Sequence, residues 1–222
     1  MAIALKRTGS TNQYVNMLVY GQSGAGKTTL CSTIDNIIIL SAEGGLLSLP
    51  EGIPYLEIQT VEDLYEAYEF ITTGEGKDYT TVCIDSLTEI AEVVLADEKD
   101  KVADARQAYM KMGDIMNKLI RSFRDLDKNT IVIAKAEKDK DESGKILWSP
   151  MMPGAKFAQS IPYHFDEVLA LRVEKDEQGK NVHMLQTHND GLWSAKSRSN
   201  KLADWEEPHI GKIIAKIQGE VK

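Results

Sequence analysis

A glycine-rich segment near the N-terminus carries the strongest chemical signal in the sequence. It reads GQSGAGKT from position 21 to 28 and matches G-x-x-x-x-G-K-[ST] in full. Glycines let the backbone turn so that its N–H groups face phosphate oxygens, and a helix opening after the loop adds the positive end of its dipole. The pattern predicts a triphosphate-binding loop formed by Gly21, Gln22, Ser23, Gly24, Ala25, Gly26, Lys27, Thr28 and Thr29.

Two residues at the end of this loop have distinct expected roles. Lys27 is expected to reach the β- and γ-phosphates, and the Thr28 hydroxyl to ligate Mg²⁺. The alternative is a glycine-rich turn with a surface lysine. The flanking sequence favours the phosphate-binding loop (P-loop), because residues 14–20 are typical of a strand and residues 27–34 of a helix.

A P-loop also needs a second residue that directs Mg²⁺, and an acid is expected in this role at the end of a neighbouring strand. Asp85 follows the apolar residues 81–84, so its carboxylate should emerge at the carboxyl edge of the sheet, where open α/β sheets bind ligands. The alternative is that Asp85 caps the helix starting at Ser86, and the two roles could coexist.

Glu43 is the third candidate for chemistry. It leaves the apolar strand at 37–40 and precedes two glycines, a position from which a carboxylate could orient and activate an attacking water. The alternative is an exposed acid in a turn.

The elements that position these residues are apolar runs separated by helical periodicity. Strands are expected at residues 14–20, 37–40, 55–58, 81–84 and 130–134, and helices at 27–34, after Thr60 and over 86–123 with a break near 97–104. The charged residues 137–145 indicate a solvated loop or hairpin tip. Three short strands at 167–173, 182–187 and 192–195, with turn signals between them, predict a β-meander.

Composition limits the environment and the partners. The net charge of −8 argues against binding polyanions by bulk attraction, although a local basic groove could still exist. Cys31 and Cys83 lie in apolar runs and are expected to be reduced and buried. No apolar run reaches membrane-spanning length, so we expect a soluble, cytoplasmic protein with no membrane partner.

Taken together, these motifs resemble those of a known protein family. The P-loop, the Ser-Ala-Glu-Gly sequence at 41–44 and the Asp-Ser pair at 85–86 resemble the RecA/RadA ATPase core in order and spacing. More closely, the chain resembles compact phage RecA-like ATPases of single-strand annealing and recombination, and stretches at 155–158, 164–168 and 195–198 extend the match. The resemblance implies an α/β fold: a RecA-like P-loop NTPase core with a mostly parallel central sheet flanked by helices, plus a C-terminal antiparallel β-meander.

The same resemblance implies a DNA-stimulated ATPase that uses ATP and Mg²⁺, with Glu43 activating water. Lys196 and Arg198 resemble the Lys-x-Arg pair that such ATPases extend into a neighbour's site to stabilise γ-phosphate charge. Otherwise they are surface charges at a strand end. The implied assembly is a homo-oligomer, ring or filament, with composite nucleotide sites, acting on single-stranded DNA in the host cytoplasm if the protein is phage-encoded.

Three segments are expected: a flexible N-terminal segment at 1–13, the ATPase domain at 14–199 and a helical C-terminal segment at 200–222. The apolar stripe of Ile210, Ile213, Ile214 and Ile217 should fold back on its own domain or dock on a neighbouring subunit.

Two features depart from the family pattern. The residue at the polar sensor position after the Asp-Ser strand is best matched by Glu137. The segments aligned with the DNA loops, 97–106 and 137–145, each carry four acids against three bases, so counterion release gives no argument for tight DNA binding.

Two other functions stay open at this stage. A nucleotide-regulated assembly or loading factor would use ATP to shift a conformational population. A small-molecule P-loop kinase would carry an arginine-rich lid, and no such cluster occurs here. The base is also left open between ATP and GTP, since no guanine-reading N-K-x-D sequence is present.

Overall fold

A computed structural model describes residues 14–140 and 144–220. The expected N-terminal segment at 1–13 therefore lies outside the described residues. Among those described, no helix is both long enough and apolar enough to cross a membrane.

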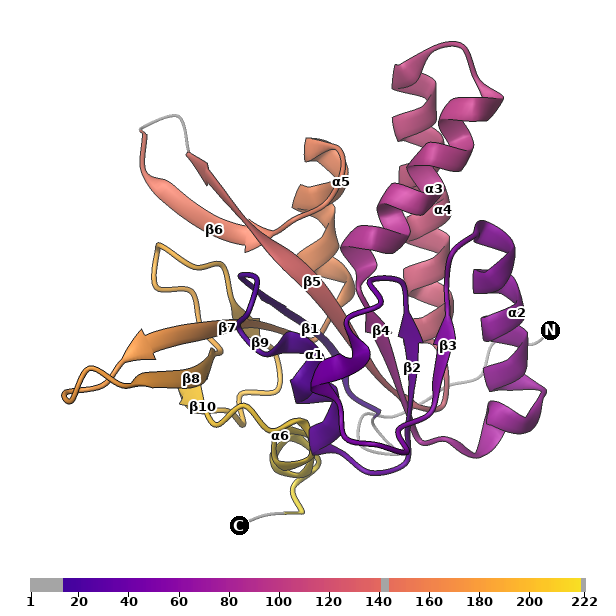
Figure 1. Cartoon of the computed structure of the whole chain (residues 1–222). Coiled ribbons are helices and arrows are strands. Elements are labelled where there is room, and N and C mark those ends of the chain that lie inside the picture. Colours follow the sequence, from indigo (N-terminus) through magenta and orange to yellow (C-terminus); the bar gives the residue numbers. More distant parts are fainter. Residues whose placement is uncertain (1–13, 141–143, 221–222) are drawn as a thin grey trace, which may run out of the picture.

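One twisted sheet organises the chain (Figure 1). Within residues 14–140 and 144–220 it has ten strands, in the order β10-β8-β7-β1-β5-β4-β2-β3, with β6 paired to β5 and β9 paired to β7. Parallel pairing joins six consecutive strands of this order: β7, β1, β5, β4, β2 and β3. Antiparallel pairing adds the other four: β6, β8, β9 and β10. The prediction of an α/β fold with a mostly parallel sheet is confirmed. The strands are β1 Asn16–Gly21, β2 Ile37–Ser41, β3 Tyr55–Glu57, β4 Thr81–Asp85, β5 Asn129–Lys140, β6 Ile146–Pro150, β7 Glu167–Lys175, β8 Asn181–Gln186, β9 Lys196–Ser197 and β10 Trp205–Glu206.

Helices cover both faces of the sheet, which explains why its central strands are apolar throughout. Leu18 and Tyr20 of β1 face a layer made with α2, α3, α4 and α5, while Met17 and Val19 face a layer made with α1 and α6. Figure 1 shows α6 beside α1, away from α2, α3 and α4. The helices are α1 Lys27–Leu30, α2 Val61–Thr72, α3 Leu87–Lys101, α4 Ala105–Arg124, α5 Ala155–Ser160 and α6 Ile210–Gln218; the 3-10 turns are Cys31–Thr33, Leu46–Ser48, Glu75–Asp78 and Ile161–His164.

Local signals set the helix boundaries. Thr60 and Asp63 form a reciprocal capping box at the start of α2, the helix that was expected after Thr60. The expected break in the long helical region falls between Lys101 and Ala105, where the Asp104 carboxylate accepts the Arg106 amide and restarts the chain as α4.

The charged residues after 136 form a hairpin. Strand β5 continues beyond the sheet to Lys140 and pairs with β6, with Lys138 opposite Trp148. The Lys138 ammonium lies 5.9 Å from the Trp148 ring centroid, so the strand position is favoured by packing as well as by backbone pairing. Of the two interpretations, the hairpin is the observed one; its tip at 141–143 lies outside the described residues.

The C-terminal strands are antiparallel as predicted, but the third differs from a simple meander. Residues 192–195 turn away from β8: the Asp190 carboxylate accepts the amides of Leu192 and Trp193, and the Ser194 amide then bonds the Trp148 carbonyl of β6. The chain returns as β9, which pairs with the start of β7. The reason is that these residues find backbone partners on the β5–β6 hairpin rather than on β8.

Helix α6 packs on its own domain. Ile210, Ile213 and Ile214 are buried in the same layer as Leu30, and the Ile210 amide donates a 2.8 Å hydrogen bond to Thr33 Oγ1. The apolar stripe is thus satisfied within one chain.

Candidate nucleotide-binding site

The glycine-rich loop leaves the carboxyl end of β1, in the middle of the sheet between β5 and β7. Gly21 must be glycine, because a Cβ there would lie 2.6 Å from the Leu171 carbonyl oxygen of β7. Gly24 and Gly26 have φ of 77° and 91°, the left-handed region that side chains rarely adopt. The backbone at these three positions therefore explains why the sequence pattern has glycine there.

Lys27 begins α1 and extends back over the loop. Its Nζ donates a 3.0 Å hydrogen bond to the Gln22 carbonyl. Burial lowers the pKa of Lys27, the carboxylates of Glu43 and Asp85 oppose this, and the Lys135 ammonium lowers it further. A partly desolvated ammonium with a loop carbonyl as partner can readily exchange that carbonyl for a phosphate oxygen.

Thr28 and Asp85 are joined directly. The Thr28 hydroxyl donates a 2.5 Å hydrogen bond to Asp85 Oδ2, while Oδ1 is buried with no hydrogen-bond partner among the described residues. Burial raises the pKa of Asp85 and the Thr28 hydrogen bond lowers it. An orphaned carboxylate oxygen beside a hydroxyl is a donor set suited to Mg²⁺, which prefers oxygen ligands.

The helix-capping alternative for Asp85 is not observed. Ser86 occupies the N-cap of α3, and its hydroxyl oxygen accepts the Glu89 amide at 3.4 Å. Asp85 is thereby left to face Thr28 rather than the helix backbone.

Glu43 lies on the loop after β2 and lines the same cavity as the P-loop. This cavity of about 600 Å³ is bordered by Ser23, Gly24, Gly26, Lys27, Thr28, Thr29, Glu43, Gly45, Ser48, Lys135, Ala136 and Met151. The Ala42 amide donates to the Asp85 carbonyl at 2.8 Å, which ties the start of the Glu43 loop to β4. The structure therefore brings together Lys27, Thr28, Glu43 and Asp85.

Two charged residues that sequence reasoning did not assign to this site also lie here. The Lys135 ammonium is 3.3 Å from Glu43 Oε1 and pairs more closely with Glu89 on α3. Lys135 stands opposite Gly21 in the β1–β5 register, so its place at the strand edge beside the P-loop was the available signal. Glu137, the residue matched to the sensor, instead pairs with Ser149 in the hairpin.

Lys196 and Arg198 lie apart from the P-loop of their own chain. Lys196 pairs with Val168, which stands opposite Leu18, three residues before Gly21, or roughly 10 Å along the strand. Arg198 is 3.3 Å from Asp166 on the exposed surface, and the Lys196 ammonium is 5.9 Å from the Tyr163 ring centroid. Both belong to the amino-terminal side of the parallel strands.

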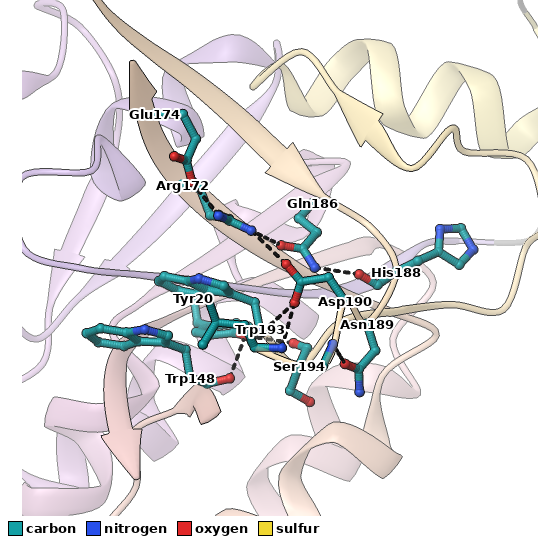
Figure 2. Close-up of polar contacts among 12 residues, drawn as sticks. Tyr20, Trp148, Arg172, Glu174, Gln186, His188, Asn189, Asp190, Trp193 and Ser194 are labelled. Carbon is teal, nitrogen blue, oxygen red and sulfur yellow. Dashed lines mark hydrogen bonds and ion pairs between the residues drawn. The ribbon is translucent and has the colours of Figure 1, made fainter. Parts of the chain in front are cut away.

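An aromatic cluster supports the strand that leads into the P-loop (Figure 2). The Tyr20 hydroxyl is shared between the carbonyls of Ser194 at 2.7 Å and Trp148 at 3.1 Å. Trp148 and Trp193 stack with centroids 4.9 Å apart, and the Arg172 guanidinium lies 5.3 Å from Trp193. The hairpin, β7 and the P-loop strand are thus packed into one unit.

Arg172 is held by polar partners as well as by the ring. It donates to Gln186 Oε1 at 2.7 Å and to Asp190 Oδ2 at 2.9 Å, and it pairs with Glu174 (Figure 2). The paired strand β8 also contacts the P-loop, because His183 Nδ1 lies 2.9 Å from the Ala25 carbonyl. No sequence pattern marked either residue, because both contacts depend on the β7–β8 pairing.

The family is decided by a match over most of the chain: residues 13–199 fit the family model described as "AAA domain". The chain belongs to this AAA domain family. No curated protein sequence matches it significantly.

Solved structures resemble the AAA domain in fold. One, from a study of a prototypical ATPase of the type III secretion system of pathogenic bacteria, superposes with a TM-score of 0.56 at 16% identity over 84% of this chain. The AAA domain spans 57% of that chain's length. A KaiC-like protein from Pyrococcus horikoshii OT3 gives 0.46 at 13% identity, covering 78% of each chain. The first of these superpositions shows that the AAA domain shares the α/β fold of that ATPase.

Proposed function

We propose that this AAA domain hydrolyses ATP with Mg²⁺, and that it does so as a homo-oligomer, ring or filament, acting on single-stranded DNA in phage-type recombination or annealing. The observation that supports hydrolysis best is one constellation. Lys27, Thr28 and Glu43 line a single cavity, and Asp85 is hydrogen-bonded to Thr28 at its edge.

Each residue has a role that follows from its position. Lys27 would exchange the Gln22 carbonyl for β- and γ-phosphate oxygens. Thr28 and Asp85 would hold Mg²⁺, which when bound neutralises phosphate charge. Glu43 would accept a proton from water as the water oxygen bonds to the γ-phosphorus and the bond to the β–γ bridging oxygen breaks, releasing ADP.

The proposed oligomer rests on Lys196 and Arg198. Within one chain they lie on the side of the sheet away from the P-loop edge, so they could serve a nucleotide only in a neighbouring subunit. A cation supplied in this way would stabilise negative charge on the γ-phosphate during transfer.

The DNA role rests on the resemblance and on the β5–β6 hairpin. This hairpin extends beyond the sheet edge that carries the P-loop (Figure 1). Its residues Lys138 and Lys140 are exposed. The Met151 amide, just after β6, donates to the Lys135 carbonyl at 2.7 Å, so the hairpin is connected to the nucleotide cavity. DNA bound there would act on the site through β5.

The test is the rate of ATP hydrolysis per subunit, measured against protein concentration with and without a single-stranded oligonucleotide. We expect the rate to rise with concentration, because sites are completed by neighbours, and to rise again with DNA. A rate that responds to neither would overturn the oligomer and DNA parts of the proposal.

Glu43→Gln isolates the chemical step. We expect it to bind ATP and to lose hydrolysis by about 10²–10⁴-fold, the usual contribution of a positioned base. Glu62→Gln, an exposed acid of α2, is the matched control. If Glu43→Gln hydrolyses ATP normally, Glu43 is not the base; phosphate transfer by a dilute monomer to a metabolite but not to water would indicate a kinase instead.

A further inference from the structure

Three charged side chains form a chain at the wall of the nucleotide cavity: Glu43, Lys135 and Glu89. The Lys135 ammonium lies between the two carboxylates, 3.3 Å from Glu43 Oε1 and in a closer ion pair with Glu89. All three side chains are about one third exposed, at 35%, 33% and 32%. They come from the β2 loop, β5 and α3, so the contact joins three separate elements.

The backbone around Lys135 is fixed. Its amide donates to Thr88 Oγ1 at 3.0 Å, and its carbonyl accepts the Met151 amide at 2.7 Å. The Thr88 hydroxyl in turn donates to the Met151 carbonyl at 2.9 Å. The Lys135 side chain can therefore change partners without movement of its backbone.

The two acids differ in how firmly they are held. Glu89 lies in the first turn of α3, anchored by its amide to the Ser86 N-cap. Glu43 lies on a loop and precedes Gly44, whose φ is 69°. Glu43 is accordingly the partner that can leave Lys135, while Glu89 stays.

A carboxylate that shares its oxygen with an ammonium is restrained and has fewer lone pairs to offer a water. Lys135 also raises the electrostatic cost of charging Lys27 across the same cavity. A terminal phosphate in this cavity would relieve both problems, because it is an anion that two lysines could share. The hydrogen bond to Glu89 raises the pKa of Lys135, so the ammonium stays charged throughout.

We propose that Lys135 is a positioning residue that restrains Glu43 until a triphosphate binds, and that it then exchanges Glu43 for the γ-phosphate while Glu89 holds it in place. The inference rests on the proposed function, since the value of releasing Glu43 is that it can then activate water. It identifies Lys135, rather than Glu137 two residues later in β5, as the residue that distinguishes a triphosphate from a diphosphate.

The test compares binding of ADP and of AMP-PNP, a slowly hydrolysed ATP analogue, with Mg²⁺ by isothermal titration calorimetry. We expect Lys135→Gln to weaken AMP-PNP about ten- to hundredfold, the value of one charge-assisted contact, and to change ADP by less than about twofold. Lys135→Arg should restore part of the preference. Lys118→Gln, an exposed lysine of α4, is the matched control.

A second arm tests the exchange itself. Glu43→Gln removes the competing carboxylate and should tighten AMP-PNP a few-fold in the wild-type background, but not in Lys135→Gln. Equal weakening of both nucleotides by Lys135→Gln, or the same tightening by Glu43→Gln in both backgrounds, would overturn the inference. Thermal melting of each variant shows whether it is folded.

These are binding measurements, so they separate the inference from the proposed function. A wild-type protein that discriminates AMP-PNP from ADP through Lys135 but does not hydrolyse ATP would refute the proposed function alone. Hydrolysis with no contribution of Lys135 to triphosphate binding would refute the inference alone.

Discussion

The Thr28 hydroxyl donates a 2.5 Å hydrogen bond to Oδ2 of Asp85, 57 residues away, and the other oxygen of that carboxylate has no partner among the described residues. Asp85 is only 2% exposed. A buried carboxylate with one free oxygen is costly in the nucleotide-free protein, and this cost would be relieved by a cation. The relationship leads to the first prediction.

Asp85→Asn should stabilise the nucleotide-free protein by about 1 kcal/mol or more, because it removes a buried charge at nearly constant shape. The same change should abolish the extra thermal stabilisation that Mg²⁺ adds to ATP. Asp114→Asn, on the exposed surface of α4, should shift stability by less than about 0.5 kcal/mol. A less stable Asp85→Asn protein would contradict the prediction.

The pH dependence of stability follows from the same residue. Burial raises the pKa of Asp85 above its ordinary value of 3.8, so the native state holds its proton to higher pH than the unfolded state. As the pH rises from the pKa of Asp85 in the unfolded state to its higher pKa in the native state, Asp85 therefore lowers the free energy of unfolding. Urea unfolding across this pH range should show a decrease in the free energy of unfolding with rising pH in the wild type, and this contribution should be missing in Asp85→Asn.

Gly21→Ala and Gly113→Ala make a matched pair of substitutions with opposite expected signs. At Gly21 the new Cβ would lie 2.6 Å from the Leu171 carbonyl in the centre of the sheet, so we expect a loss of about 1–3 kcal/mol. At Gly113, within α4, a Cβ meets nothing within 4 Å, so better helix propensity should add about 0.5–1 kcal/mol. Urea unfolding midpoints measure both. Equal effects would refute the steric reason.

Lys27→Ala should weaken ATP binding by tenfold or more, since it removes a charge-assisted phosphate contact. Because burial lowers the pKa of Lys27, its loss should not destabilise the nucleotide-free protein. The readout is the shift in melting temperature caused by Mg²⁺-ATP, with Lys118→Ala as control. A normal shift in Lys27→Ala would argue against the assigned loop.

Tyr20→Phe should destabilise the protein by about 1–3 kcal/mol, because two carbonyls, of Ser194 and Trp148, lose a buried hydroxyl partner. Tyr163→Phe removes the same hydroxyl at a residue that is 76% exposed and should be close to neutral. Guanidinium unfolding of the two variants gives the comparison. A neutral Tyr20→Phe would mean that the cluster does not depend on this contact.

Features that depend on neighbouring residues could be predicted from the sequence. The P-loop glycines, the apolar central strands and the Thr60 cap are each specified within a few residues by backbone sterics, burial on both faces and side-chain capping. Asp85 could be placed at a strand end for the same reason. These local rules also explain why the hairpin and the α3–α4 break were expected near their observed positions.

Features that depend on long-range pairing could not be predicted in this way. The contact of Lys135 with Glu89 spans 46 residues and exists because β4 and β5 are adjacent and in a particular register. The path of residues 192–197 was likewise decided by hydrogen bonds to the β5–β6 hairpin and to β7. The local sequence of these segments does not specify which residues they will contact in the folded chain.

By itself, the sequence determined that a phosphate loop leaves a buried parallel strand and that acids stand at neighbouring strand ends, because both follow from local backbone and burial chemistry. Only the tertiary structure decided which charges meet. It set Lys135 against Glu43 and Glu89, and it placed Lys196 and Arg198 away from the P-loop of their own chain. Strand order and register arise from packing of the whole sheet, which no short segment specifies.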